Sequence, residues 1–551
     1  EFKTSDFFSV PTSNLAWMDA IGNKQIIGKK LLRPMQKDGE SKVKTIEPLD
    51  YENKPAFLSA YAPNHENGLG DIKVYMDQFE KYDNWCGGFI YDFVDQAIRR
   101  KIDGQEQWLY GGDFGEAKTS GYLCATGMVA SDRSLHPAAH EIKKIYQNYE
   151  IQGGDLENFH VTFSKKSPFD DPNLYGVRWE LLEDGETLQR GEQDLLVFED
   201  CKSQTVALEV DGVDKIDGAE YHLNMSMHLK QPTLWGEEDH VVAWEQLKMT
   251  HQKRPHTKHV SSKELAIHDR KIKTEITGDG FSIMISKLTG DITSIVYDKK
   301  EYILAPLKLN FYRVPTDNDL ETQREYKRKY KTRINWKKVS ESYQVQKVSI
   351  ENLKSEVIIQ VHRKVKYIKK SLITEYVIDG SGNLFVSHQM TPKRNLMKFG
   401  TSMDISDEFS TLSWFGKGLQ ENYCDRQSGA KVGVYSCHVN DYVHNYLRPQ
   451  ENSNRTDIRW FSATTEGGEG LYFEDVEGTL LNMSAWPYTL KNLEEADHIH
   501  ALRPKNTITL NIDYKQKGVG SEDENGAGLS DEHKLLKNRQ YKYGYKICRA
   551  Y

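Results

Sequence analysis

The most informative stretch of this sequence is DIKVYMDQFEKYDNWCGGFIYDFVDQ, residues 71–96. Its first part predicts a helix over residues 71–81, because apolar side chains recur there at helical spacing: Ile72, Tyr75, Met76 and Phe79. A glycine pair and a short apolar run then predict a buried strand at residues 87–91. Residues 92–99 leave the carboxyl end of that strand. Helix, strand and loop in this order are typical of a β/α unit.

The pattern changes after about residue 155. Polar and apolar residues alternate in residues 159–163, 175–181 and 219–225, with Asp and Gly turns between them. Short alternating strands with such turns predict an immunoglobulin-like antiparallel sandwich. Residues 251–265 are polar and without periodicity, which predicts a linker. Strand and turn patterns then continue from residue 266 to 551, which favours one large two-sheet sandwich.

Composition limits the functional classes. The net charge of the 551 residues is -8, which argues against nucleic acid as a partner. No apolar run approaches the roughly 18 residues of a transmembrane segment. The sequence begins at Glu1, and no signal-like segment follows it. We therefore expect a soluble protein without a visible targeting segment, whose compartment and native start stay open.

The six cysteines are widely spaced, and no Cys-x-x-Cys pair occurs. Zinc-site spacing is thus absent, and we expect no metal and no cofactor. Free thiols are the expectation for Cys86, Cys124, Cys201, Cys424, Cys437 and Cys548.

Several blocks follow one another in an informative order. They are GGFIYDFVDQ (87–96), YGGDFGE (110–116), DRSLHP (132–137), AWEQ (243–246), RVPTDND (313–319) and GKGLQENY (416–423), the last followed by Asp425 and Arg426. In this order and spacing they resemble the glycoside hydrolase family 2 β-galactosidases. The resemblance runs from about residue 30 to the end of the chain.

The resemblance implies a mainly β fold with an α/β amino-terminal part. Residues 1–150 would be the last portion of a (β/α)8 barrel, and residues 151–255 the immunoglobulin-like sandwich that follows it. Residues 266–551 would be the large carboxyl-terminal β-supersandwich that covers the mouth of the active site. This division agrees with the periodicity described above.

The resemblance also places the catalytic nucleophile. In the family a Glu precedes Tyr-Ala-His, and Gly-Asn follows a few residues later. The matching stretch here is residues 57–70, FLSAYAPNHENGLG, which aligns without a gap. The nucleophile position is therefore Ala60, whose methyl group cannot attack an anomeric carbon, and the family's His position is Pro63.

A retaining glycosidase needs two carboxyl groups about 5–5.5 Å apart. The family's acid/base Glu lies in an Asn-Glu pair on an earlier strand, and no such pair precedes residue 60. The neighbouring Pro63, Asn64, His65 and Glu66 also depart from the family pattern, which favours drift over a single engineered change. We expect neither Glu66 nor Glu116 to act as a displaced nucleophile, because small positioning errors reduce the rate strongly.

Sugar-contacting positions differ as well. The barrel Asn that touches sugar and a monovalent ion in the family falls at Thr126, and a stacking Trp falls at Tyr91. A second Trp, near the end of the chain, aligns with Asn525. Tyr61 and Asp92 complete the candidate remnant of a sugar cleft. For the other polar scaffold residues we expect structural roles, including a contact of residues 420–426 across the interface between sandwich and barrel.

A partial barrel has unpaired strand edges. We therefore expect a protein partner that covers the open edge, such as a chain with the amino-terminal half. The first functional hypothesis is a non-catalytic pseudoenzyme subunit that acts as a scaffold in a larger assembly. The second is a component of an active β-galactosidase complemented by another chain. The third is a carbohydrate-binding protein that stacks sugars on exposed aromatic rings.

Overall fold

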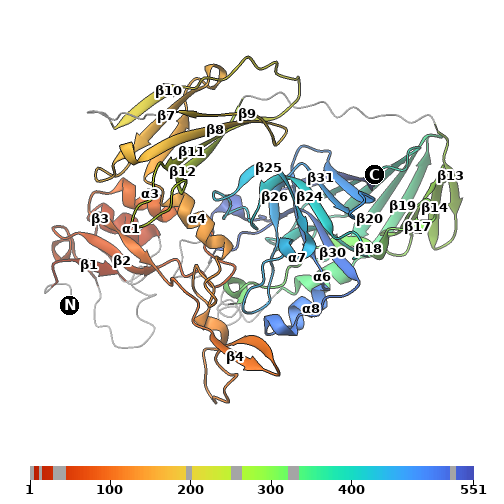
Figure 1. The fold of residues 1–551 in the computed structure, drawn as a ribbon. Helices are drawn as coiled ribbons and strands as arrows, with labels where there is room; N and C mark the ends of the chain where they lie inside the picture. The colour runs from red at the N-terminus through yellow and green to blue at the C-terminus, as the bar shows by residue number, and fades with distance from the viewer. Residues whose placement is uncertain are drawn as a thin grey trace.

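The computed structural model describes residues 5–10, 15–28, 45–193, 202–249, 263–320, 334–520 and 529–550. Figure 1 shows three parts: an α/β segment that includes the amino terminus, a small β-sandwich above it, and a large β-sandwich that includes the carboxyl terminus. Each part has its own cluster of buried apolar side chains. The expected fold class, mainly β with an α/β amino-terminal part, is thus confirmed. The division at residues 1–150, 151–255 and 266–551 stays a prediction, because separate cores do not by themselves show independently folding domains.

The α/β segment is built on a three-stranded parallel sheet in the order β1-β2-β3. Three helices accompany it, and the hairpin β4–β5 projects from it at the bottom of Figure 1. The strands are β1 (Phe8–Val10), β2 (Ala56–Tyr61), β3 (Trp85–Ile90), β4 (Ile98–Ile102) and β5 (Gln105–Leu109), and the helices are α1 (Leu15–Gly22), α3 (Lys73–Lys81) and α4 (Pro137–Ile145). The predicted helix at 71–81 and the predicted strand at 87–91 correspond to α3 and β3.

Helices cover one face of this parallel sheet, and the other face has exposed apolar side chains among the described residues. Leu58 and Trp85 are buried in the core that the helices share with the sheet. Phe7, Phe57 and Phe89 form a row of edge-to-face aromatic contacts with centroid separations of 5.9 and 6.0 Å. Phe7 is 51% exposed and Phe89 67% exposed, so this row leaves large apolar side chains open to solvent.

The small sandwich packs a three-stranded sheet against a four-stranded sheet. The first sheet has the order β10-β7-β6, with β6 (Tyr149–Gly153), β7 (His160–Lys165) and β10 (Ser203–Ala207). The second has the order β12-β11-β8-β9, with β8 (Tyr175–Glu183), β9 (Glu186–Gln193), β11 (Tyr221–Leu229) and β12 (Val241–Lys248). Two small antiparallel sheets around one core fit the expected immunoglobulin-like architecture.

The large sandwich consists of a ten-stranded and a nine-stranded sheet. The first runs β13-β14-β15-β16-β18-β23-β30-β29-β26 with β17 beside β16: β13 (Ala266–Asp269), β14 (Lys273–Gly278), β15 (Phe281–Ser286), β16 (Ile292–Tyr297), β17 (Lys300–Glu301), β18 (Ile303–Asn310), β23 (Lys398–Ser406), β26 (Arg455–Ile458), β29 (Leu481–Trp486) and β30 (Thr507–Gln516). The second runs β19-β20-β21-β22-β31-β28-β27-β24-β25: β19 (Gln344–Asn352), β20 (Glu356–Lys364), β21 (Leu372–Asp379), β22 (Leu384–Met390), β24 (Thr411–Gly418), β25 (Lys431–His438), β27 (Trp460–Thr464), β28 (Gly470–Asp475) and β31 (Tyr541–Ala550). Short helices connect the strands: α6 (Trp336–Glu341), α7 (Val439–Tyr442) and α8 (Leu490–Glu495).

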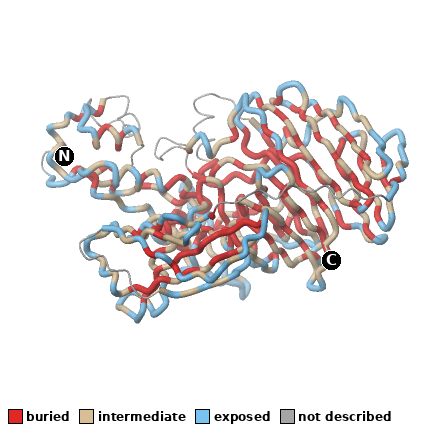
Figure 2. The backbone as a smooth tube through the Cα atoms, turned by 90° about the horizontal axis from the view of Figure 1, so that it is seen from above, coloured by how far each residue is buried: buried red, intermediate tan, exposed pale blue. Residues whose placement is uncertain are grey.

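Alternation explains why these strands form a closed core. In β20, every second side chain from Val357 to Arg363 is buried, as the period of two in a strand requires. Figure 2 shows buried backbone running through the whole large sandwich, whereas exposed backbone is prominent around the amino-terminal segment.

The small sandwich is fixed to both neighbours. Lys144 on α4 pairs with Glu245 at 2.8 Å, and its ammonium lies 4.5 Å from the ring centre of Trp244. Gln246 accepts from the backbone N–H of Val432 and donates to the carbonyl of the same residue, both at 2.7 Å. The linker predicted at 251–265 lies largely outside the described residues.

Candidate functional site

The nucleophile position of the resemblance lies at the carboxyl end of β2. Leu58 pairs with Gly88 and Tyr61 with Ile90, so three steps along β2 oppose two along β3. This register shift leaves Ser59 and Ala60 between two buried neighbours, with Ser59 exposed and Ala60 partly exposed. The side chain at the strand end is a methyl group, which has neither a nucleophilic nor an acidic atom.

Backbone hydrogen bonds gather most of the other predicted cleft residues at this strand end. The N–H of Tyr91 donates to the carbonyl of Tyr61 at 3.0 Å, and the N–H of Asp92 donates to that of Thr126 at 2.9 Å. Pro63, partly exposed, follows in the loop after β2. Asn525 lies outside the described residues. The fold therefore brings Tyr61, Tyr91, Asp92 and Thr126 to the carboxyl ends of β2 and β3.

The side chains at these positions point to different environments. Tyr61 is buried, its hydroxyl is 2.5 Å from that of Tyr146, and its ring centre is 5.0 Å from that of Tyr75. Thr126 is also buried, whereas Tyr91 is 49% exposed. The Asp92 carboxylate accepts from the Phe93 N–H and from the Gln96 side chain, both at 2.6 Å. Only Tyr91 of these four presents a large exposed surface, so the gathered residues do not form an open sugar-binding wall.

Glu66, the carboxylic acid that follows Ala60 in the loop after β2, is fully buried. Both of its carboxylate oxygens lie within 3.1 Å of the Leu447 N–H, which donates to them. Burial and the nearby charges of Asp95 and Asp317 raise the pKa of Glu66 well above its usual range. A buried carboxyl group that favours its protonated form is a poor nucleophile.

Glu116 is also engaged structurally. Its carboxylate accepts from the backbone N–H groups of Gly112 and Phe114 at 3.3 and 3.0 Å, within an exposed loop. It braces a turn through backbone N–H groups, which is a structural role.

The interface between the α/β segment and the large sandwich is a polar network. Arg426, 2% exposed, donates to the carbonyl of Gly68 at 2.7 Å and to the side chain of Asn67 at 2.9 Å. It also pairs with the buried Glu421 at 2.8 Å. The expected contact of residues 420–426 across this interface is confirmed by these bonds.

A second part of the same network joins His136 to the sandwich, a contact that the sequence did not predict. His136, at the start of α4, lies 2.7 Å from the Asp95 carboxylate and 2.9 Å from His444 of the sandwich. Gly127 approaches Asp95 so closely that a Cβ there would lie 2.3 Å from the Asp95 backbone nitrogen. The available signal was His136 before Pro137, but the partner His444 is 308 residues away along the chain.

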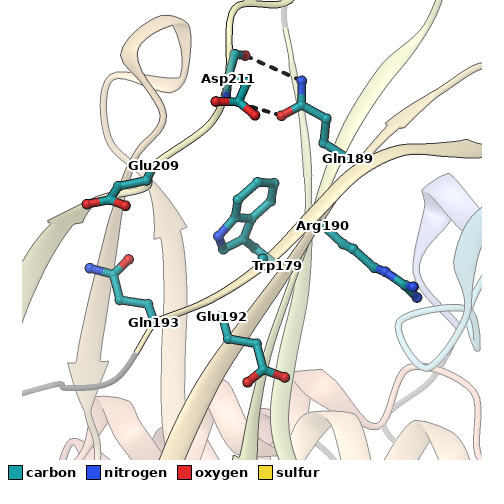
Figure 3. A pocket seen from close by; sticks show the side chains of 8 residues that line it. Trp179, Gln189, Arg190, Glu192, Gln193, Glu209 and Asp211 are labelled. Atoms are coloured by element: carbon teal, nitrogen blue, oxygen red, sulfur yellow. Dashed lines mark hydrogen bonds between the residues drawn. The ribbon is translucent and has the colours of Figure 1, made fainter.

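The third hypothesis, carbohydrate binding, would need exposed aromatic rings. In the described part of the large sandwich, every Phe, Tyr and Trp side chain is buried or only partly exposed. The small sandwich has a cavity of about 540 Å³ beside Trp179 (Figure 3). There Gln189 and Asp211 hydrogen-bond to each other, and Glu192 and Glu209 add carboxylates. Trp179 itself is only 5% exposed, so its ring offers little surface for stacking.

Among the described residues, no group of three or more His, Cys, Asp or Glu side chains is arranged to hold a metal ion. None of the helices in the described segments has the length and apolar character that crossing a bilayer requires.

Comparisons with known proteins match this architecture along the chain. The family model for glycosyl hydrolases family 2, TIM barrel domain, matches residues 23–151. The model for β-galactosidase, domain 4, matches residues 162–250, and that for the β-galactosidase small chain matches residues 277–547.

Whole-chain relatives agree with these matches. A β-galactosidase of Priestia megaterium is 28% identical over 507 residues, covering 90% of this chain and 48% of the relative. A β-galactosidase of Lactobacillus delbrueckii subsp. bulgaricus is 30% identical over 487 residues, covering 87% of this chain and 46% of the relative. A solved structure of a galactose 1-epimerase from Lactobacillus acidophilus matches with a TM-score of 0.30 and 8% sequence identity. The match covers 53% of this chain and 99% of that structure, and the likeness is remote.

The fold and these matches place the chain among the relatives of glycoside hydrolase family 2. Within that class it is a relative of the carboxyl-terminal half of the β-galactosidases. The chain spans about half the length of the curated relatives it matches.

Proposed function

We propose that this chain is a non-catalytic β-galactosidase-like subunit that acts as a structural scaffold in a larger assembly. The observation that carries the proposal is Ala60 at the carboxyl end of β2, at the position that the resemblance gives to the nucleophile. Without a carboxylate there, no glycosyl-enzyme can form on this strand. The buried Glu66, bonded to the Leu447 N–H, does not replace it.

We propose further that the partner is a polypeptide carrying the amino-terminal half of the barrel. Among the described strands, β1 and β3 pair only with β2, so each has an outer edge without a neighbour. Unpaired edges and exposed apolar surface favour association. The Phe7, Phe57 and Phe89 row supports the same surface, because Phe57 and Phe89 lie on strands that a completed barrel would enclose and Phe7 directly precedes β1.

The activity test uses the purified assembly of this chain with its partner. We expect no hydrolysis of nitrophenyl β-galactoside above the rate of the partner alone. The variant Ala60→Glu restores a carboxylate at the strand end, and Ala60→Gln is its matched control without an acid. Turnover by the unmodified assembly, with a covalent sugar adduct trapped on this chain, would overturn the non-catalytic assignment.

The partner test is separate from the activity test. Analytical ultracentrifugation of the isolated chain should show self-association that increases with concentration, and co-expression with the partner should give a defined complex. A stable, well-folded monomer that does not bind the partner would contradict the partner proposal and leave the catalytic one untouched.

A second candidate is a component of an active β-galactosidase. The match to a family described as the β-galactosidase small chain favours it. In this case the assembly would hydrolyse galactosides, and both catalytic carboxyl groups would have to come from the partner. A trapped adduct on the partner, rather than on this chain, would distinguish this candidate from the first.

A further inference from the structure

Two histidine rings meet where the α/β segment contacts the large sandwich. His136 caps the start of α4, and His444 follows α7 of the sandwich. Nδ1 of His136 and Nε2 of His444 are 2.9 Å apart, and the other ring nitrogen of His136 is 2.7 Å from the Asp95 carboxylate. His136 and Asp95 are 2% and 4% exposed, so water screens this contact poorly.

The number of protons on the two rings decides whether their hydrogen bond can form. A hydrogen bond between two ring nitrogens needs one nitrogen with a proton and one with a free lone pair. The bond therefore persists when both rings are neutral, and when one ring is cationic and donates. If both rings are cationic, two N–H groups face each other at 2.9 Å, and the bond becomes a repulsion. The intact contact thus accepts one added proton but not two.

The surroundings oppose the second proton. Burial, followed by the charges of His136, Arg426, Arg455 and His140, holds the pKa of His444 well below its usual range. The Tyr446 ring packs against both histidines, at 4.7 Å from His444 and 5.7 Å from His136. The charged groups that face the pair are Asp95, Asp132 and His140 on the α/β segment and Arg426 and Arg455 on the sandwich.

The nearby carboxylates do not compensate a second positive charge on the histidine pair. Asp95 already faces His136 and accepts from the Gly127 N–H at 2.7 Å. Glu421 is bonded to Arg426 and accepts from the Tyr446 hydroxyl and from the Ser453 N–H. Burial and the charge of Asp95 raise the pKa of Glu66, which therefore favours its protonated form. The second cation would therefore have no free counter-charge among these carboxylates.

We propose that the His136–His444 contact is an acid-sensitive latch between the α/β segment and the large sandwich. At neutral pH the latch helps to hold the start of α4 against the sandwich, next to the bond from the Gly429 N–H to Glu141 at 2.8 Å. Acidification favours the open form, in which both rings can be protonated. Opening would loosen the α/β segment, which is the part that the proposed partner contacts.

The pH dependence of opening follows from the number of protons that the open and closed forms bind. An exposed histidine has a pKa near 6.5, so below about pH 6.5 the open latch binds one proton more than the closed latch. The opening equilibrium should then rise by up to about tenfold per pH unit as pH falls through this range. At higher pH the opening equilibrium no longer depends on pH in this way, because neither form takes up the second proton.

Hydrogen exchange measured by mass spectrometry tests the latch locally. Exchange rates at pH 7.5 and 5.5 are corrected for the intrinsic chemistry and compared for residues 126–145 and 439–450. We expect roughly tenfold faster corrected exchange at pH 5.5 in both segments. Strand β21 of the sandwich serves as the internal reference and should change much less.

Matched variants separate the latch from general acid sensitivity. His444→Gln keeps a hydrogen-bond acceptor for His136 but cannot take up a proton, so its corrected exchange should be nearly independent of pH in this range. His268→Gln removes an exposed histidine from β13 and should behave like the unmodified chain. If His444→Gln does not fold, His444→Phe keeps a ring against Tyr446 and makes the same prediction for pH dependence.

Two results would overturn the latch. One is an acid response of the His444 variants equal to that of the unmodified chain. The other is corrected exchange at pH 5.5 that rises equally in β21 and at the contact, which would indicate global destabilisation, for example through the buried His388.

Discussion

The large sandwich and the parallel sheet of the α/β segment use the same kinds of side chain with opposite results. In the sandwich, two broad sheets close on each other, and aromatic residues such as Phe473 are completely buried. In the α/β segment a three-stranded sheet is covered by helices on one face, and Phe89 on the other face is 67% exposed. The difference teaches that the sandwich completes its own core, whereas the parallel sheet supplies only part of one.

The largest expected effect contrasts two phenylalanines. Phe473→Ala, in β28, should lower the free energy of unfolding by about 3–5 kcal/mol, because it leaves a cavity in a closed core. Phe89→Ala, in β3, should change it by less than about 0.5 kcal/mol in the isolated chain. Chemical denaturation measures both. Equal costs for the two variants would break the comparison and show that the open face is already covered.

The next effect concerns the contact that joins the small sandwich to the large one. Burial alone would raise the pKa of Glu220, but the bonds and charge of Arg459 hold that pKa at about 2. A lowered carboxyl pKa stabilises the folded chain above the unfolded value, near 4.3, and this contribution is lost as pH falls from there toward 2. It amounts to about 3 kcal/mol at neutral pH.

Glu220→Gln should remove most of this contribution and flatten the stability profile between pH 5 and 3. Denaturation midpoints of the variant and the unmodified chain at these two pH values measure it. Glu186→Gln, an exposed change on β9, is the control. An unchanged pH profile in Glu220→Gln would mean that Arg459 does not fix this contact.

A smaller effect uses the thiol on the open sheet. Cys86, on β3, is exposed, whereas burial raises the pKa of the thiols of Cys124, Cys424, Cys437 and Cys548. Because the thiolate is the reactive form, Cys86 should be alkylated at least about tenfold faster than these four in the isolated chain. Peptide mass spectrometry follows each site. Binding of the proposed partner should protect Cys86, and undiminished labelling in the complex would place the partner elsewhere.

The smallest effect lies on the outer surface of the α/β segment. Lys73 and Asp77 form an exposed pair on α3, four residues apart, with 2.5 Å between the charged atoms. Lys73→Ala should cost only about 0.3–0.5 kcal/mol, and high salt should remove most of this. A cost above about 1 kcal/mol in thermal unfolding would mean that this helix surface is part of a contact that the chain makes with itself or with a second copy.

Local patterns predicted much of the fold. The glycine pair and apolar run at 87–91 predicted a strand close to β3, because short apolar runs are typical of buried parallel strands. The helix at 71–81 was predicted two residues too long at its start. Asp71 adopts a left-handed backbone conformation, and its carboxylate accepts from the Ser530 N–H and pairs with His533. A partner more than 450 residues away cannot be read from local spacing.

For the candidate site, too, some features follow from the sequence and others only from the tertiary structure. The sequence determined that residue 60 has only a methyl side chain, because side-chain chemistry is fixed by residue identity, and the resemblance predicts that this is the nucleophile position. They also predicted a helix and a strand of the α/β segment and the mainly β character of the rest, because periodicity is local. Only the tertiary structure decided that Tyr61 turns into the core, that Glu66 meets Leu447 and that His136 meets His444. These contacts join segments that are 308 or more residues apart in two of the three cases, and their energy depends on burial that exists only after the chain has folded.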